Sequence, residues 1–274
     1  MREVIESFGS FAEWRAWLEK NPWAYDPAYI EAVVADIART GFADPLFGYV
    51  PPPELVIGDQ NYREGIVAKN LNSRLRGVCH VLAGELLAKG PSLRVYAPEW
   101  VSPFAQMLKS VVDFQGSEYL PTEAERAKHS TIQHQDVMAL TYPDATFDAY
   151  ITNEVMEHIP AIQPALVEAH RVLKPSGVFF GTFPMAYMAE ESIRKTEIVD
   201  GKLVHLMPAE YHGNPIDPSG GSLVFTIPAW DIVDQARAAG FHDPRIMFIS
   251  SRRHAILGAE IAGILVFVAR REPN

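Results

Sequence analysis

One stretch, residues 147–184, constrains the fold more than any other part of the chain. Its sequence is FDAYITNEVMEHIPAIQPALVEAHRVLKPSGVFFGTFP, with apolar strands expected at residues 147–152 and 178–183. A helix between the strands is indicated by apolar side chains at helical spacing, namely Leu166, Ala169, Val172 and Leu173. This order predicts a parallel βαβ unit of an open α/β sheet. Ligands of such sheets bind beyond the carboxyl ends of the strands, where Asn153 and Glu154 follow the first strand.

The composition excludes several classes of protein. A chain of 274 residues, 48% of them hydrophobic, can bury the core of one large α/β domain with a helical extension. The 24 Lys and Arg residues against 34 Asp and Glu residues give a net charge of −10, which argues against a broad nucleic-acid surface. The single cysteine, Cys79, lies among apolar residues and cannot form an internal disulfide, so we expect it to be buried. No apolar run approaches the roughly 20 residues that span a bilayer, and residues 1–10 lack a signal-peptide core. We therefore expect a cytoplasmic protein without a membrane partner.

Residues 1–90 are predicted to form a mainly helical N-terminal extension. A capping-box pattern at Ser10 and Glu13 precedes one helix, and Asp26 with the following proline begins a second, which Gly41 ends. Apolar residues at helical spacing predict a third helix over residues 71–87.

Residues 91–274 are predicted to form the sheet domain. Further strands are expected at residues 93–97, 114–118, 131–135, 245–250 and 263–269. A polar excursion over residues 185–227 interrupts this pattern. Because so long an excursion in a compact domain is usually functional or flexible, we expect an insertion that covers a substrate.

Four segments occur as an ordered set: QDVMAL at residues 135–140, YPDATFDAYITNEVMEHI at 142–159, EAHRVLKPSG at 168–177 and AGF at 239–241. Together with the final strand pair, the set resembles the class I S-adenosylmethionine-dependent methyltransferases over roughly residues 93–271. The resemblance implies a Rossmann-like, doubly wound, seven-stranded sheet whose last strand lies antiparallel beside the previous one. It also implies S-adenosylmethionine as the cofactor.

The resemblance assigns nucleoside-binding roles to two acidic positions. Glu118 stands 21 positions after Ala97, close to the spacing of an acid that accepts hydrogen bonds from ribose hydroxyls; Tyr119, which follows it, is assigned to the same site. In the resembling family an acid at the position of Asp136 meets the adenine amino group, and the backbone N–H of the next residue, here Val137, meets a ring nitrogen. The alternatives are a solvated acid at Glu118 and an ordinary helix cap at Asp136.

The turn after the first strand of the sheet domain departs from the family pattern. The family has a glycine-rich loop there, whereas residues 96–100, YAPEW, contain no glycine. Either Tyr96, Ala97, Glu99 and the helix N-terminus near Ser102 hold the cofactor slightly farther out, or the site has lost it. Free N–H groups at a helix N-terminus can receive the methionyl carboxylate.

The reacting end of the cofactor or the substrate would face Asn153 and Glu154, unless these residues only cap the next turn. A base with a pKa near neutrality suits removal of a hydroxyl proton, and the candidates are His212 in the excursion and His158. His205, Glu210 and His212 offer an alternative as metal ligands, but their spacing matches no strong template. We therefore predict no metal site.

These assignments predict a methyltransferase that transfers the methyl group of S-adenosylmethionine to a small-molecule or glycan-like acceptor, at oxygen. Two other classes remain open. The glycine-free turn also fits a non-catalytic methyltransferase-like binding or scaffold subunit, and the same fold serves non-methylating enzymes such as a lyase or an epimerase. Aromatic residues in the extension pack either internally or against a second copy in a homo-oligomer.

Overall fold

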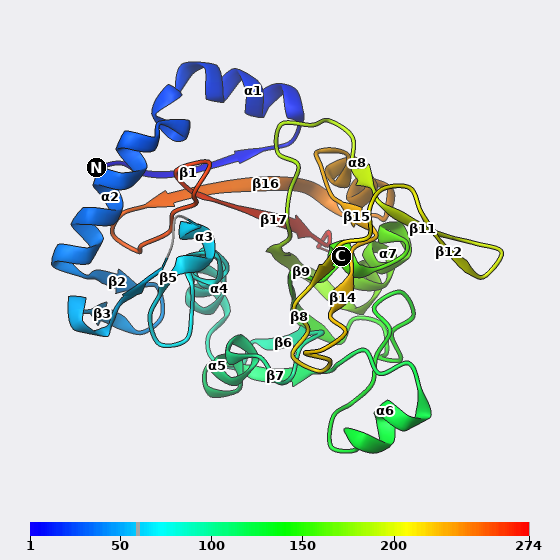
Figure 1. Ribbon diagram of the computed structural model, residues 1–274. Coiled ribbons are helices and arrows are strands. Elements are labelled where there is room, and N and C mark those ends of the chain that lie inside the picture. The colour runs from blue at the N-terminus through cyan, green and yellow to red at the C-terminus, as the bar shows by residue number, and fades with distance from the viewer. Residues whose placement is uncertain (59–60, 274) are drawn as a thin grey trace. The chain divides into compact units, whose positions relative to one another are not determined.

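A seven-stranded sheet with flanking helices dominates the computed structural model, which describes residues 1–58 and 61–273 (Figure 1). The strands follow the order β1-β16-β17-β9-β8-β6-β7. Their bounds are β1 (Glu3–Phe8), β6 (Arg94–Ala97), β7 (Asp113–Gly116), β8 (Phe147–Asn153), β9 (Leu173–Thr182), β16 (His242–Ser251) and β17 (Ile264–Arg270). The sheet is mixed, because β6, β7, β8 and β9 pair in parallel and β1 pairs antiparallel with β16. β16 and β17 run in opposite directions (Figure 1). The predicted Rossmann-like class is confirmed.

The chain divides into two compact units. The first unit contains Met1–Gly90 and Arg245–Phe267, and the second contains Pro91–Pro244 and Val268–Asn274. Helices of the first unit are α1 (Phe11–Lys20), α2 (Pro27–Thr40), the short α3 (Tyr62–Gly65) and α4 (Ser73–Lys89). The predicted caps are present, because the side chains of Ser10 and Asp26 accept hydrogen bonds from the first turns of α1 and α2. The unit also contains the short strand pairs β2 (Phe42–Asp44) with β3 (Gly48–Val50) and β4 (Val56–Ile57) with β5 (Ile66–Val67).

The first unit has an aromatic cluster and one deeply buried cation. The rings of Trp14 and Trp17 stack at 5.5 Å, and Trp17 lies 5.1 Å from Phe248, so these aromatic residues pack inside the unit. Arg76 is fully buried and its guanidinium lies 4.6 Å from the ring of Phe42. It donates hydrogen bonds to the backbone carbonyls of Ile66, Leu71, His254 and Ala255.

The second unit contains the βαβ unit that the sequence predicts. β8 is followed by α7 (Ile162–Val172) and then by β9, and the two strands pair in parallel from Ala149↔Val178 to Asn153↔Thr182. The other helices are α5 (Pro103–Val111), α6 (Glu123–Lys128) and α8 (Asp231–Ala238). Since β6, β7 and β8 are parallel neighbours, their carboxyl ends lie at the same edge of the sheet.

Two strand predictions need correction. The strand expected at residues 131–135 is reduced to an isolated parallel bridge between Glu118 and His134. This segment, TIQHQ, has only one apolar residue, so little side-chain burial favours a longer strand. β1 has no local sequence signal, because most of its residues are exposed and it exists through its pairing with β16.

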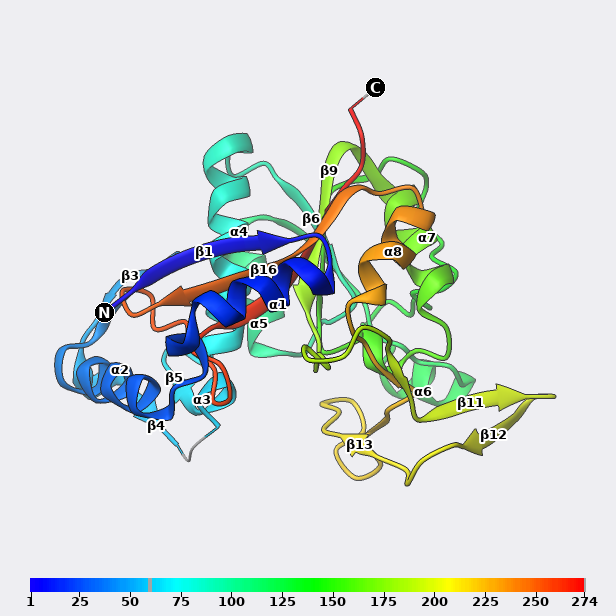
Figure 2. The ribbon, with the colours of Figure 1, turned by 90° about the horizontal axis from the view of Figure 1, so that it is seen from above.

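The predicted excursion, residues 185–227, consists of short antiparallel pairs. These are β10 (Ile193–Arg194) with β15 (Thr226–Ile227), β11 (Thr196–Val199) with β12 (Lys202–His205) and β13 (Tyr211–His212) with β14 (Ser222–Leu223). The β11–β12 hairpin extends away from α7 and α8 (Figures 1 and 2). Within residues 1–58 and 61–273, no helix combines the length and apolar character needed to traverse a bilayer.

Candidate functional site

The turn between β6 and α5 is held against the end of β7 by Glu118. Its Oε1 accepts hydrogen bonds from the backbone N–H groups of Trp100, at 2.7 Å, and Val101, at 3.2 Å. Burial raises the pKa of Glu118 above its ordinary value, although these two N–H groups act in the opposite direction. Both bonds use the same oxygen, which orients the carboxylate and leaves Oε2 available for a ligand hydroxyl.

Gly116, the last residue of β7, has no side chain and so leaves room for the backbone of this turn, which itself contains no glycine. A Cβ added at Gly116 would lie 2.6 Å from the carbonyl oxygen of Glu99, a distance that real Cβ atoms do not show. The backbone of the glycine-free turn therefore approaches β7 closely because the glycine lies on the neighbouring strand. A turn without glycine can therefore still lie close to the neighbouring strand.

Glu99 and Asn153 connect the turn after β6 to the end of β8. The Nδ2 group of Asn153 donates a hydrogen bond of 2.8 Å to Glu99 Oε1, and the other carboxylate oxygen, Oε2, accepts one from the hydroxyl of Ser102. Because the carboxylate of Glu99 requires a donor, the amide of Asn153 is oriented with its Oδ1 away from this contact. Oδ1 is buried and has no hydrogen-bond partner among the described residues.

Tyr96, Ala97 and Tyr119 contribute differently to this edge. The side chain of Tyr96 is fully buried, its hydroxyl forms a 2.8 Å hydrogen bond with Ser117, and burial raises its pKa well above the ordinary value. A ligand contact from Tyr96 would therefore use the backbone. Ala97 is buried at the end of β6, opposite Gly116. Tyr119 is 60% exposed, so its ring is accessible from solvent.

Asp136 and Val137 lie in a turn. Asp136 Oδ1 accepts a hydrogen bond of 2.8 Å from the N–H of Met138, and its carbonyl accepts one from Ala139. Asp136 therefore caps a turn and not the helix that the alternative expected, and its second oxygen is not used by that bond. Val137 is 8% exposed.

Glu154 begins the connection that leads from β8 to the histidines. Its φ of 54° lies in the left-handed region, which residues other than glycine seldom adopt. Its N–H donates a hydrogen bond of 2.8 Å to the carbonyl of Thr182 in β9. This bond fixes the start of the segment that contains Glu157 and His158.

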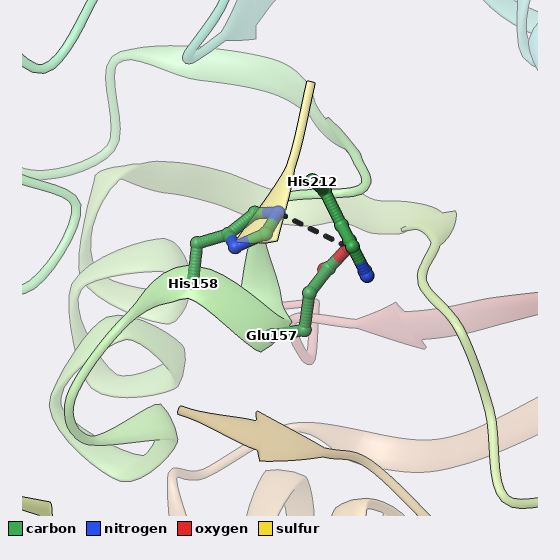
Figure 3. Close-up of side chains that lie close together, drawn as sticks. All are labelled: Glu157, His158 and His212. Carbon is green, nitrogen blue, oxygen red and sulfur yellow. Dashed lines mark ion pairs between the residues drawn. The ribbon is translucent and has the colours of Figure 1, made fainter. Parts of the chain in front are cut away.

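A second group of polar side chains consists of Glu157, His158 and His212 (Figure 3). Glu157 and His158 belong to the short 3-10 turn η3 (Met156–His158), and His212 belongs to β13. Glu157 Oε1 lies 3.5 Å from Nε2 of His158 and 3.6 Å from Nδ1 of His212. The imidazole rings lie 5.0 Å apart, nearly perpendicular to each other. The two residues predicted as bases are thus adjacent.

The side chains of this group differ in how far they are buried. The side chain of Glu157 is 0% exposed and neither carboxylate oxygen has a hydrogen-bond partner among the described residues, whereas the His212 side chain is 30% exposed. The adjacent carboxylates of Glu157 and Glu210 raise the pKa of His212 to about 9, against the lowering effect of burial. A protonated imidazole cannot accept another proton, so His212 must first lose its proton to act as a base.

Sequence reasoning overlooked Glu157. The residue lies in a segment read as part of the family pattern, and its neighbour His212 lies in β13, more than 50 residues away along the chain. The alternative metal set of His205, Glu210 and His212 is not the group that the structure brings together. Among the described residues, the group that could hold a metal ion is Glu157, His158 and His212. His205 instead contacts the hydroxyl of Thr196 at 3.1 Å.

Residues 98–181 match the model of a protein family described as a methyltransferase domain. This part of the chain is similar to that family of methyltransferase domains. The match covers less than a third of the 274 residues, and it includes the turn after β6, Glu118, Asp136 and the end of β8. The predicted resemblance to the class I S-adenosylmethionine-dependent methyltransferases is confirmed as a resemblance over these residues.

Several solved structures are similar in fold. The 1,6-didemethyltoxoflavin-N1-methyltransferase of Burkholderia thailandensis, solved with bound 1,6-didemethyltoxoflavin and S-adenosylhomocysteine, is 18% identical over 68% of this chain and 74% of that chain, with a TM-score of 0.38. An S-adenosylmethionine-dependent methyltransferase from Mesorhizobium loti is 14% identical over 70% and 97%, with a TM-score of 0.45. The [4+2]-cyclase SpnF is 16% identical over 80% and 89%, also with a TM-score of 0.45. No curated protein matches the sequence.

Proposed function

We propose that the protein is an S-adenosylmethionine-dependent methyltransferase that methylates an oxygen of a small-molecule or glycan-like acceptor. The observation that carries the proposal is the methyltransferase-domain match over residues 98–181, which contains the polar residues at the carboxyl ends of β6, β7 and β8. The same match supports S-adenosylmethionine as the cofactor.

The nucleoside of the cofactor would bind beside β7. In this proposal Oε2 of Glu118 accepts hydrogen bonds from the ribose hydroxyls, while Oε1 stays bonded to the turn. The free oxygen of Asp136 would accept a hydrogen bond from the adenine amino group, with Val137 and Tyr119 beside the ring. The proposal uses polar atoms that the internal hydrogen bonds of this edge leave available.

The methionine end would bind between the turn after β6 and the end of β8. Asn153 Oδ1 is a buried acceptor without a partner among the described residues, and an ammonium group is a donor that would satisfy it. The carboxylate of Glu99, bonded to Asn153, adds a negative charge next to that donor. Ala97 lets the cofactor approach because it has no long side chain.

The reaction itself is an in-line displacement. When bound, S-adenosylmethionine would supply the methyl group: the acceptor oxygen would bond to the methyl carbon, and the electron pair of the broken carbon–sulfur bond would stay on sulfur as a neutral thioether. The hydroxyl proton leaves to a base, for which His158 and His212 are the candidates. Positioning supplies much of the rate in such a step, so residues 185–227, which contain His212, would hold the acceptor.

The test is a product search with S-adenosylmethionine labelled with ¹³C at its methyl group. The protein is incubated with the labelled cofactor and with small hydroxyl compounds and sugars, and the products are examined by NMR spectroscopy. The proposal predicts new O-methyl signals that require the protein. Labelled methyl groups found only on nitrogen or carbon would refute O-methylation, and binding of the cofactor without turnover across acceptor classes would favour the scaffold alternative. Self-association and cytoplasmic location stay predictions.

A further inference from the structure

We infer that Glu157, His158 and His212 form a binding site for a divalent transition-metal cation. One ligand atom from each residue lies within 4.8 Å of the other two. The donor set is one carboxylate oxygen and two imidazole nitrogens, which suits Zn²⁺ or Mn²⁺ better than Ca²⁺, a cation that prefers oxygen ligands alone.

The buried carboxylate of Glu157 is the observation that indicates a bound cation. Its side chain is 0% exposed, and neither carboxylate oxygen has a hydrogen-bond partner among the described residues. A buried carboxylate without hydrogen bonds is costly, and buried charges are normally paired or coordinate a metal. A cation between the carboxylate and the two imidazoles would remove this cost.

The outer nitrogen of His158 is already held by an acceptor. Nδ1 of His158 lies 3.0 Å from the carbonyl oxygen of Leu223. Because a carbonyl can only accept, this contact places the proton on Nδ1, and the neutral ring then has its lone pair on Nε2. Nε2 is the atom that lies 3.5 Å from Glu157 Oε1. Two acceptors that face each other in this way need a cation or a proton between them.

His212 shows the same arrangement with the nitrogens exchanged. Nε2 of His212 lies 3.1 Å from Glu210 Oε1, so it donates to that carboxylate, and Lys195 pairs with the other oxygen of Glu210. Nδ1 then faces Glu157 Oε1 at 3.6 Å, and a bound cation would displace the second proton that the adjacent carboxylates favour on this ring. Metal-binding histidines commonly donate their second ring N–H to a carboxylate or a backbone carbonyl, which fixes the tautomer. Both histidines of this group have such a partner.

The separations fit coordination geometry. Metal–ligand distances of about 2.0–2.2 Å in a tetrahedral site place neighbouring ligand atoms about 3.3–3.6 Å apart. The distances from Glu157 Oε1 to the two imidazole nitrogens are 3.5 and 3.6 Å. Three protein ligands leave one position open, and the partly exposed histidines give access to it. With the cation bound, the lone pairs of both imidazoles would be used as ligands, so under the proposed function the cation, acting as a Lewis acid on the acceptor oxygen, would take the place of a histidine base.

Metal binding is measured without cofactor or acceptor. A negative result would therefore count against the metal site alone and not against the proposed methylation. Untagged protein, stripped with a chelator, is titrated with Zn²⁺, Mn²⁺ and Mg²⁺ by calorimetry, and Co²⁺ is used as a spectroscopic probe. We expect one equivalent of Zn²⁺ and Co²⁺ absorption bands typical of four or five ligands. The variants Glu157→Gln and His212→Asn should bind at least about 100-fold more weakly, since loss of an outer partner alone typically costs about 10- to 100-fold.

Two controls separate the site from general effects. The variant His205→Ala removes a histidine of the same excursion that contacts Thr196, and it should bind like the wild type. Glu210→Gln should weaken binding about 10- to 100-fold with the stoichiometry unchanged. If a variant does not fold, histidine NMR of the wild type decides: Zn²⁺ should shift the ring signals of His158 and His212 and not those of His205. No stoichiometric binding by the wild type, or equal binding by the folded variants, would overturn the inference.

Discussion

Asn153 at the end of β8 donates a hydrogen bond of 2.8 Å to Glu99, which lies in the turn after β6. Two segments more than 50 residues apart are thereby joined at the carboxyl edge of the sheet. The bond also determines the orientation of the Asn153 amide and leaves its Oδ1 as a buried acceptor. The proposed methionine end of the cofactor site depends on this pair.

The first prediction concerns this pair. Glu99→Ala and Asn153→Ala should each weaken binding of S-adenosylmethionine, and each should lower the free energy of unfolding by about 1–3 kcal/mol, because a buried polar group loses its partner. The double variant should be less destabilised than the sum of the single variants, since the two changes remove one shared bond. Urea unfolding and calorimetry measure both effects. Strict additivity would show that the bond does not couple the two residues.

Glu118 provides the second prediction. Glu118→Ala should weaken binding of S-adenosylmethionine by about 1–3 kcal/mol, or about 5- to 150-fold, because the ribose loses its acceptor. The turn at Trp100 and Val101 also loses its anchor. The matched control is Glu123→Ala, which removes an exposed acid at the start of α6 and should leave affinity unchanged. Calorimetric affinities that do not differ between the two variants would refute the ribose assignment.

The third prediction concerns the close approach of the turn after β6 to β7. Gly116→Ala should destabilise the protein by about 1–3 kcal/mol and weaken cofactor binding, because the added Cβ meets the carbonyl of Glu99 at 2.6 Å. Gly84→Ala in α4 is the control, and it should change the stability in the opposite direction, since the added Cβ meets nothing within 4 Å. Alanine there should stabilise the helix by about 0.5–1 kcal/mol. Thermal unfolding distinguishes the two; a Gly116→Ala protein as stable as the wild type would contradict the steric argument.

Arg76 tests the packing of the first unit. Arg76→Leu should lower the free energy of unfolding by about 3 kcal/mol or more, because four backbone carbonyls, three of them buried, lose their donor. Arg15→Ala, at an exposed position paired with Glu19, should change it by less than about 0.5 kcal/mol. Urea denaturation followed by tryptophan fluorescence reports in part on this unit, which contains three of the five tryptophans, including the Trp14–Trp17 stack. Equal midpoints for the two variants would mean that Arg76 is not a structural residue.

Much of the fold is predictable because its signals are local. β6, β8 and β9 contain apolar runs, and the N-caps of α1 and α2 precede their helices at the expected positions. β1 is different, because most of its side chains are exposed and its conformation comes from pairing with β16. The β11–β12 hairpin has a local sequence signal, the Asp-Gly pair between its strands. Asp200 and Gly201 at its tip both have positive φ, as expected for a type I′ turn.

The site was less predictable than the fold. Glu118, Asn153 and Glu99 were identified from strand ends and from the resemblance, which the sequence contains directly. Glu157 was missed, because a glutamate in a polar turn ordinarily faces solvent. Its burial, and the meeting of His158 with His212, result from the folding of residues 185–227, and that arrangement is determined by tertiary contacts.

The most direct test of the central claim is calorimetric titration of the full chain with S-adenosylmethionine and with S-adenosylhomocysteine. The account predicts that the folded wild-type protein binds one equivalent of each, and that Glu118→Ala and Asn153→Ala weaken both affinities while Glu123→Ala does not. Folded wild-type protein that binds neither compound would contradict the assignment of the carboxyl edge of β6, β7 and β8 as a cofactor site.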